Sequence, residues 1–181
     1  MVRLRTASRE DLEYLTGLAQ DPSVAPFLAP AGLILERLEA LLREPAADGG
    51  EPAGDGGPDG MFVIETETGQ PVGGIAVHLF SRNSRICELS TLMVDPAAQR
   101  SGVGSAAVSL ACHRVLVEHG FHRVQAETYG DNLTAQRLFE RVGFVREGLR
   151  RSAYWRRDQW LDSVLYGLLA EELRDVSGSA G

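Results

Sequence analysis

The sequence contains no lysine, and all 18 of its basic residues are arginine. A Walker A phosphate loop needs a lysine after its glycines, and a pyridoxal phosphate enzyme needs one for its Schiff base, so both classes are excluded. Cysteine is scarce too, because Cys87 and Cys112 are the only two and both lie in apolar segments. We expect two buried free thiols in a reducing compartment rather than a disulfide framework.

Long apolar runs are also missing. No stretch approaches the ~20 apolar residues that a membrane helix needs. The N-terminus through Arg9 is polar and basic and lacks the apolar core of a secretory signal. The net charge of −7 argues against non-specific binding to nucleic acid or anionic membranes. We therefore expect a cytoplasmic protein without nucleic-acid or membrane partners.

The chain does have the size and hydrophobic content of one ordinary domain, with 181 residues of which 44% are hydrophobic. Hydrophobic spacing predicts strands over residues 2–6, 61–67, 71–80, 85–94, 123–128, 144–150 and 164–169. It predicts helices over residues 9–20, 33–43, 102–119 and 133–142. This order indicates an α/β domain with a mixed sheet.

One internal segment has a different composition. Residues 45–60 hold six glycines, three prolines and four acidic residues. Such a composition cannot bury enough apolar surface to offset the cost of ordering, so we predict a disordered loop. The 44 residues before it are too few to fold alone, and we therefore expect one domain over residues 1–176. Residues 177–181 are predicted to be a frayed tail.

The most informative stretch joins the predicted strand 85–94 to the predicted helix 102–119. It reads VDPAAQRSGVGS from Val94 to Ser105. Glycines let the backbone approach an anion, and the free N–H groups of a first helical turn point at it. Three interpretations stay open at this level. Gly102 and Gly104 form a tight turn only, belong to a dinucleotide fingerprint, or hold the pyrophosphate of coenzyme A.

Two motifs carry a resemblance to a known family. Gln99-Arg100-x-Gly102-x-Gly104 resembles the acetyl-CoA motif of the GNAT superfamily of N-acetyltransferases. The stretch NLTAQRLFERVGF, from Asn132 to Phe144, resembles the second half of the same domain. Glu147-Gly148-x-x-Arg151 and Asp162-x-x-x-Tyr166 are similar to the RimJ/RimL-like branch, which acetylates the N-termini of ribosomal proteins.

The resemblance implies a single GNAT-like domain with a central mixed, mostly antiparallel, splayed sheet flanked by helices. Acetyl-CoA, as co-substrate, would lie between strands 85–94 and 123–128. The residues implied to bind it are Leu92, Met93 and Val94 through their main chain, Gln99, Arg100, Ser101, Gly102, Val103, Gly104 and Ser105 at the pyrophosphate, and Asn132 and Phe139 on the other side. No metal is implied, and the pair His119 and His122 lacks further ligands.

Two carboxylates are candidates for the base that takes the amine proton. The resemblance points first to Glu127, at the end of one cleft strand, and then to Glu88, at the start of the other. Solvated or ion-paired glutamates are the alternative for each. Many relatives carry a tyrosine as general acid where this chain has Phe139, which cannot donate a proton. Tyr129 or a water would then protonate the leaving thiolate, or it would leave unassisted.

The leading hypothesis is an acetyl-CoA-dependent N-acetyltransferase acting on a primary amine. A protein N-terminal α-amine is slightly favoured over a small molecule such as an amine or antibiotic, and a homodimer is common among relatives. A non-catalytic acyl-CoA-binding module on the same fold is the alternative from another class. The arginines of residues 137–157 either form a solvated face or contact a CoA phosphate or an acidic substrate. Tyr154, Trp155 and Trp160 are assigned to core, dimer surface or substrate wall.

Overall fold

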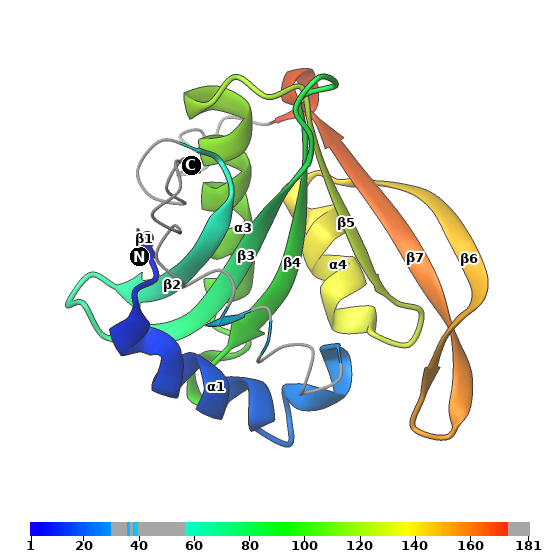
Figure 1. The fold of residues 1–181 in the computed structure, drawn as a ribbon. Helices are drawn as coiled ribbons and strands as arrows, with labels where there is room; N and C mark the ends of the chain where they lie inside the picture. The colour runs from blue at the N-terminus through cyan, green and yellow to red at the C-terminus, as the bar shows by residue number, and fades with distance from the viewer. Residues whose placement is uncertain (30–35, 37, 40–56, 174–181) are drawn as a thin grey trace, which may run out of the picture.

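The computed structural model describes residues 1–29, 36, 38–39 and 57–173. These form a seven-stranded sheet with the order β1-β2-β3-β4-β5-β7-β6 (Figure 1). The strands are β1 (Val2–Thr6), β2 (Gly60–Thr66), β3 (Pro71–Ser81), β4 (Ile86–Val94), β5 (Arg123–Tyr129), β6 (Val145–Arg156) and β7 (Gln159–Leu169). The α-helices are α1 (Leu12–Gln20), α3 (Val103–His113) and α4 (Leu133–Val142).

Short helical turns complete the described chain. They are 3-10 turns at Arg9–Asp11, Ala25–Phe27, Pro96–Ala98 and Ala170–Glu172, and a π-helical turn at Arg114–Glu118 that follows α3. The predicted helix over 33–43 lies outside the described residues except for positions 36, 38 and 39. The predicted loop 45–60 lies outside them up to residue 56, and so does the tail 177–181.

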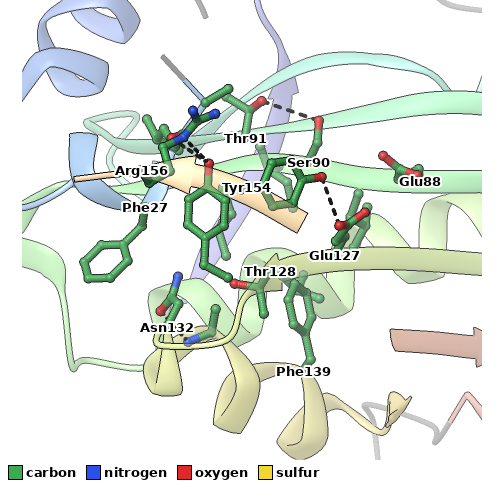
Figure 2. A pocket seen from close by; sticks show the side chains of 18 residues that line it. Phe27, Glu88, Ser90, Thr91, Glu127, Thr128, Asn132, Phe139, Tyr154 and Arg156 are labelled. Carbon is green, nitrogen blue, oxygen red and sulfur yellow. Dashed lines mark hydrogen bonds between the residues drawn. The ribbon is translucent and has the colours of Figure 1, made fainter. Parts of the chain in front are cut away.

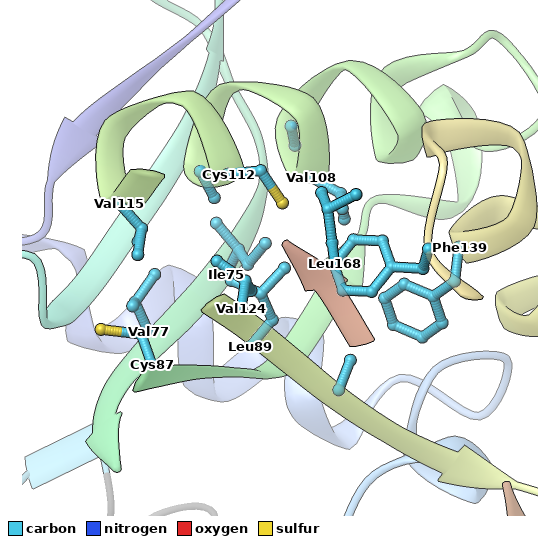
Figure 3. Close-up of a cluster of buried hydrophobic side chains, with 14 of the residues drawn as sticks. Ile75, Val77, Cys87, Leu89, Val108, Cys112, Val115, Val124, Phe139 and Leu168 are labelled. Atoms are coloured by element: carbon cyan, nitrogen blue, oxygen red, sulfur yellow. The ribbon is translucent and has the colours of Figure 1, made fainter. Parts of the chain in front are cut away.

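Alternating strand residues build a core on each face of the sheet. Helices α3 and α4 pack on one face, over side chains such as Ile75, Leu89 and Val124 (Figure 3). Helix α1 packs on the other face, against residues that include Ala76 and Met93. Cys87 and Cys112 are buried free thiols, as predicted. No helix of the described ranges is long and apolar enough to cross a membrane.

The sheet opens between β4 and β5, which confirms the splayed architecture implied by the resemblance. The two strands pair in parallel only from Ile86 opposite Arg123 to Leu89 opposite Ala126, and no pairing beyond that is present in the described part. On its other edge β4 bulges against β3, where the register moves from Ser90 to Met93. Thr91 has a φ of 51° at this bulge. The bulge and the opening lie side by side in the middle of the sheet.

Arg5 ties β1 to both β2 and the start of the first helical segment. Its Nη2 lies 2.8 Å from Asp11 Oδ1, and its Nε lies 2.7 Å from Oε1 of the buried Glu65. The backbone N–H of Ser8 also donates to Asp11, at 2.7 Å, which is one of the two hydrogen bonds of a capping box. The hydrogen bond from Arg5 lowers the pKa of Asp11 to about 2.

Replacing Arg5 by glutamine is expected to lower the unfolding free energy by about 1 kcal/mol at neutral pH, allowing for solvent screening. Since the folded pKa of Asp11 is depressed, its contribution is complete above the unfolded value of about 3.9 and is lost as the pH falls through about 2. The difference from wild type should therefore shrink at about pH 3. Urea unfolding at neutral pH and at about pH 3 measures this difference in unfolding free energy. Arg9→Gln, at an exposed residue, is the control. A difference that did not change with pH would contradict this assignment.

Candidate active site

Two adjoining cavities lie at the opening of the sheet. The inner cavity, of about 350 Å³, contains Glu88, Thr91, Glu127 and Tyr154 in its wall. The loop cavity, of about 580 Å³, follows the segment from Val94 to Ser105. Both are lined by Phe27, Leu92, Asn132 and Ala135. The shared wall makes them one continuous site with two compartments.

The loop cavity has the features of an anion site. Arg100 and Gly102 take left-handed φ values of 60° and 88°. Left-handed residues next to a helix N-terminus are typical of backbone that binds anions. Within the described chain, no backbone acceptor is recorded for the N–H groups of the first three residues of α3, Val103–Ser105. A Cβ on Gly102 would meet nothing within 4 Å, so this glycine is required by its φ and not by crowding. These N–H groups can bind phosphate oxygens.

Three arginines complement these N–H groups. Arg100 comes from the loop, and Arg137 and Arg141 come from α4. No carboxylate within salt-bridge distance of any of them is found among the described residues. The cavity thus combines positive charge with open donors, although the chain has no lysine. This donor set fits the phosphates of coenzyme A.

The other predicted cofactor residues take several positions. Leu92, Val94 and Gln99 line the loop cavity. Met93 is fully buried with α1, Val103 packs on the core, and the Ser101 hydroxyl donates to Ala98 at 2.6 Å, so the side chains of these three residues line neither cavity. Only their main chain can contribute to binding.

Asn132 caps helix α4 and also lies in the wall of both cavities. Its Oδ1 accepts a hydrogen bond from the Ala135 N–H at 3.1 Å, which caps α4. The residue also lines both cavities. A capping carboxamide still has its NH₂ group available as a donor.

The two candidate bases lie on neighbouring strands in the inner cavity (Figure 2). Glu127 accepts hydrogen bonds from Arg150 Nη1 at 3.0 Å, from the Tyr154 hydroxyl at 2.9 Å and from the Ser163 hydroxyl. Glu88 accepts one, from Gln125 Nε2 at 2.9 Å. No cation pairs with Glu88 in the part of the chain that the structure describes. Glu88 therefore has more lone-pair sites without a hydrogen-bond donor than Glu127 has.

The hydroxyl groups of both tyrosines in the inner cavity already have hydrogen-bond partners. The Tyr129 hydroxyl donates to the Leu28 carbonyl at 3.2 Å and accepts from Arg156 Nε at 3.0 Å. The Tyr154 ring packs edge-on against Tyr129, with centroids 5.3 Å apart. Burial first, and then the hydrogen bond to Glu127, raises the pKa of Tyr154 to about 12. Tyr154 therefore keeps its proton at neutral pH.

Phe139 forms an apolar part of the inner wall. It is 6% exposed, and its ring packs 5.2 Å from that of Phe144 and 5.4 Å from that of Tyr166. It offers packing and no proton. Potential metal ligands do not gather in groups of three or more anywhere in the described ranges.

The sequence analysis left open that arginines of residues 137–157 contact an acidic substrate, but it did not single out Arg156. Strands β6 and β7 are longer than predicted and form a hairpin whose turn, Arg157 and Asp158, has φ values of 51° and 58°. Such turns are usually recognised by Asn-Gly or Asp-Gly, which this chain does not have here. The hairpin carries Tyr154 and Arg156 to the inner cavity, in agreement with the substrate-wall alternative for Tyr154.

Comparisons with known proteins agree with this geometry. Residues 33–144 match the Acetyltransferase (GNAT) family. Over 78 residues the chain is 27% identical to the "Uncharacterized N-acetyltransferase YnaD" of Bacillus subtilis (strain 168), which covers 43% of this chain and 46% of that protein. The match thus spans about half the length of this curated relative.

Solved structures extend the likeness to nearly the whole chain. Spermidine N-acetyltransferase from Vibrio cholerae, in complex with CoA and spermine, has a TM-score of 0.76 at 16% identity, covering 94% of this chain and 96% of that one. A candidate phosphinothricin N-acetyltransferase has a TM-score of 0.71 at 22% identity, covering 93% and 98%. At these identities the likeness shows a shared fold. The RimJ/RimL-like branch stays a prediction.

Proposed function

We propose that this chain, which belongs to the acetyltransferase (GNAT) family, is an acetyl-CoA-dependent N-acetyltransferase that acts on a primary amine. The observation that carries the proposal is the continuity of the two cavities. One offers open N–H groups and three arginines for phosphates, and the other offers two carboxylates beside the opening of the sheet. Family membership supports the enzyme class that the sequence predicts.

The chain's own residues fit coenzyme A in a definite order. The N–H groups of Val103–Ser105, with Arg100, Arg137 and Arg141, would hold its phosphates. Leu92 lies in the shared wall and Val94 lines the loop cavity, next to the β4 bulge. The main chain of residues 92–94 would bind the pantetheine arm there. When bound, acetyl-CoA supplies an acetyl group activated as a thioester.

The role of base is assigned to Glu88, because it has fewer hydrogen-bond donors than Glu127 and so more open lone-pair sites toward an incoming amine. A carboxylate has about four lone-pair sites. Three donors occupy sites of Glu127, and one donor occupies a site of Glu88. An amine attacks only when unprotonated, and an α-amino group has a pKa of about 7.7–8.0. Glu88 would take this proton, directly or through water, while Glu127 would hold the Tyr154 hydroxyl in place.

Among the described residues, the inner cavity has no strong acid for the leaving sulfur. The Tyr129 proton is directed to Leu28, and Phe139 has none to give. Tyr154, with its pKa of about 12, can donate a hydrogen bond but is a far weaker acid than a thiol of about 8.5. Proton transfer from Tyr154 would be uphill. Unassisted departure, or protonation by water, is what these residues allow.

Replacing Glu127 by glutamine is expected to lower kcat by less than about 30-fold, because it weakens one or two hydrogen bonds worth about 1 kcal/mol each. Tyr154→Phe should have an effect of similar size. The kcat of the double variant should be little lower than that of the slower single variant, because both substitutions affect the same hydrogen bond between Tyr154 and Glu127. Steady-state kinetics with saturating acetyl-CoA measures this. A loss above about 100-fold for Glu127→Gln alone would make Glu127 the base.

Two finer predictions about the acceptor remain part of this proposal. The resemblance to the RimJ/RimL-like branch supports a protein N-terminal α-amine, and the likeness in fold to the Vibrio cholerae spermidine N-acetyltransferase supports a small amine. A homodimer and a cytoplasmic location stay predictions from the sequence.

Calorimetry with acetyl-CoA, followed by a thiol-release assay over peptides and small amines, tests the proposed function. Tight binding without turnover of any amine would favour the non-catalytic module.

A further inference from the structure

Arg156 is the cation of the inner cavity without an acidic partner. Of the neighbouring arginines, Arg150 pairs with Glu127 and Arg157 pairs with Asp131. For Arg156 no carboxylate within salt-bridge distance is found in the described chain, although the residue lines the cavity. A cation in the wall of a site without a protein anion is available for an anion of the ligand.

The guanidinium of Arg156 is held in a fixed orientation. Its Nε donates to the Tyr129 hydroxyl at 3.0 Å, and its Nη1 donates to the Trp155 carbonyl at 3.0 Å. Its central carbon lies 5.8 Å from the Tyr129 ring centroid and 5.9 Å from that of Tyr154. An arginine has five N–H donors, so three remain without a partner among the described residues. Such a pre-oriented fork suits two oxygens of one anionic group.

The opposite charge in the same cavity is Glu88, whose recorded partner is the neutral amide of Gln125. The cavity therefore offers one carboxylate without a cation and one guanidinium without an anion. A cavity of about 350 Å³ is at the small end of the range for ligand sites, roughly 300–1,000 Å³. Charge and size together describe a small zwitterion.

Building on the proposed function, we propose that the acceptor is a small amine that also carries a carboxylate or a similar oxyanion, as an α-amino acid does. Arg156 binds the oxyanion, and Glu88 faces the ammonium group that is to lose its proton. Arg156 is then a specificity-determining residue. A polyamine would bring a second positive charge to Arg156, so this cavity disfavours it.

The experiment compares kcat/KM for L-amino acids and for their C-terminal amides, which lack the oxyanion. Because amidation also makes the α-ammonium group more acidic, each kcat/KM is calculated on the concentration of unprotonated amine. Wild type should prefer the free acids at least about 10-fold, and spermidine should be at least as poor as the amides. In Arg156→Gln, the value for the acids should fall at least about 30-fold while that for the amides changes less than about 3-fold. Arg156→Lys, which keeps the charge but not the fork, should retain part of the preference.

Arg151→Gln is the matched control, because Arg151 is exposed, lies on the same strand and lines neither cavity. This variant should leave kcat/KM unchanged for both the acids and the amides. Amides as good as acids in wild type, an equal loss on both in Arg156→Gln, or a preference for amidated peptides would overturn the inference.

A binding measurement separates failure of this inference from failure of the proposed function. Calorimetric titration of the CoA-bound protein with an amino acid, and then with its amide, needs no turnover. Selective binding of the acid that is lost in Arg156→Gln supports the inference even if no amine is acetylated. Turnover of amines without such selectivity refutes the inference and leaves the proposed function intact.

Discussion

Replacing Ser105 by aspartate is expected to raise the dissociation constant for acetyl-CoA at least about 30-fold, or about 2 kcal/mol. Ser105 lies in the first turn of α3 and lines the loop cavity. The substitution places a negative charge where the phosphates of coenzyme A are proposed to bind. An acidic residue in a first helical turn favours the helix itself, so the loss should come from binding and not from folding.

Ala106→Asp is the matched control for this substitution. Ala106 lies in the same turn but is exposed and outside the lining of the loop cavity, so its variant should bind acetyl-CoA nearly as wild type does. Gly104 is a less suitable position, because a Cβ there would lie 2.9 Å from Leu138 Cδ1 and would disturb the contact between α3 and α4. Titration calorimetry and thermal melting of both variants measure the effect. If both aspartate variants bound acetyl-CoA with equal affinity, the phosphates of coenzyme A would not bind at this loop.

Glu88→Gln is expected to lower kcat at least about 100-fold, within the range typical of general-base catalysis. Glutamine keeps the size of the side chain and its contact with Gln125, but it cannot accept the proton. Affinity for acetyl-CoA should stay unchanged, because Glu88 does not line the loop cavity.

The pH profile distinguishes a base from a structural carboxylate. As the pH rises toward the pKa of the acceptor, about 7.7–8.0 for an α-amine, more acceptor arrives already deprotonated. The deficit of Glu88→Gln should then shrink. A deficit that is independent of pH would assign Glu88 a positioning role. Near wild-type rates for both Glu88→Gln and Glu127→Gln would mean that water takes the proton.

Local patterns predicted most elements of the fold. The bounds of β1 and α4 agree with the predicted ranges 2–6 and 133–142. Helix α4 ends at a glycine, the residue most common at this position, with Gly143 at a φ of 112°. These features depend on spacing and capping within a few residues. The splayed sheet, in contrast, was implied by the resemblance, because no local signal fixes which strands separate.

The different hydrogen-bonding environments of Glu88 and Glu127 could not be predicted from the sequence. The donors to Glu127 come from Arg150, Tyr154 and Ser163, which are 23 to 36 positions later in the chain. Only the register of β5 against β7 and of β6 against β7 brings them together. The hydroxyl of Tyr129 is likewise occupied by Leu28, 101 positions away. Long-range pairing decides which of several chemically similar side chains is free to react.

The central claim is that acetyl transfer to an amine takes place in the two joined cavities. The most direct measurement follows released CoA thiol and acetylated amine together, for wild type, Ser105→Asp and Glu88→Gln with an amino-acid acceptor. The account predicts equal amounts of thiol and acetylated amine in wild type, recovery of Ser105→Asp at high acetyl-CoA, and no such recovery for Glu88→Gln. Thiol release without acetylated amine in wild type, or full activity of both variants, would contradict it.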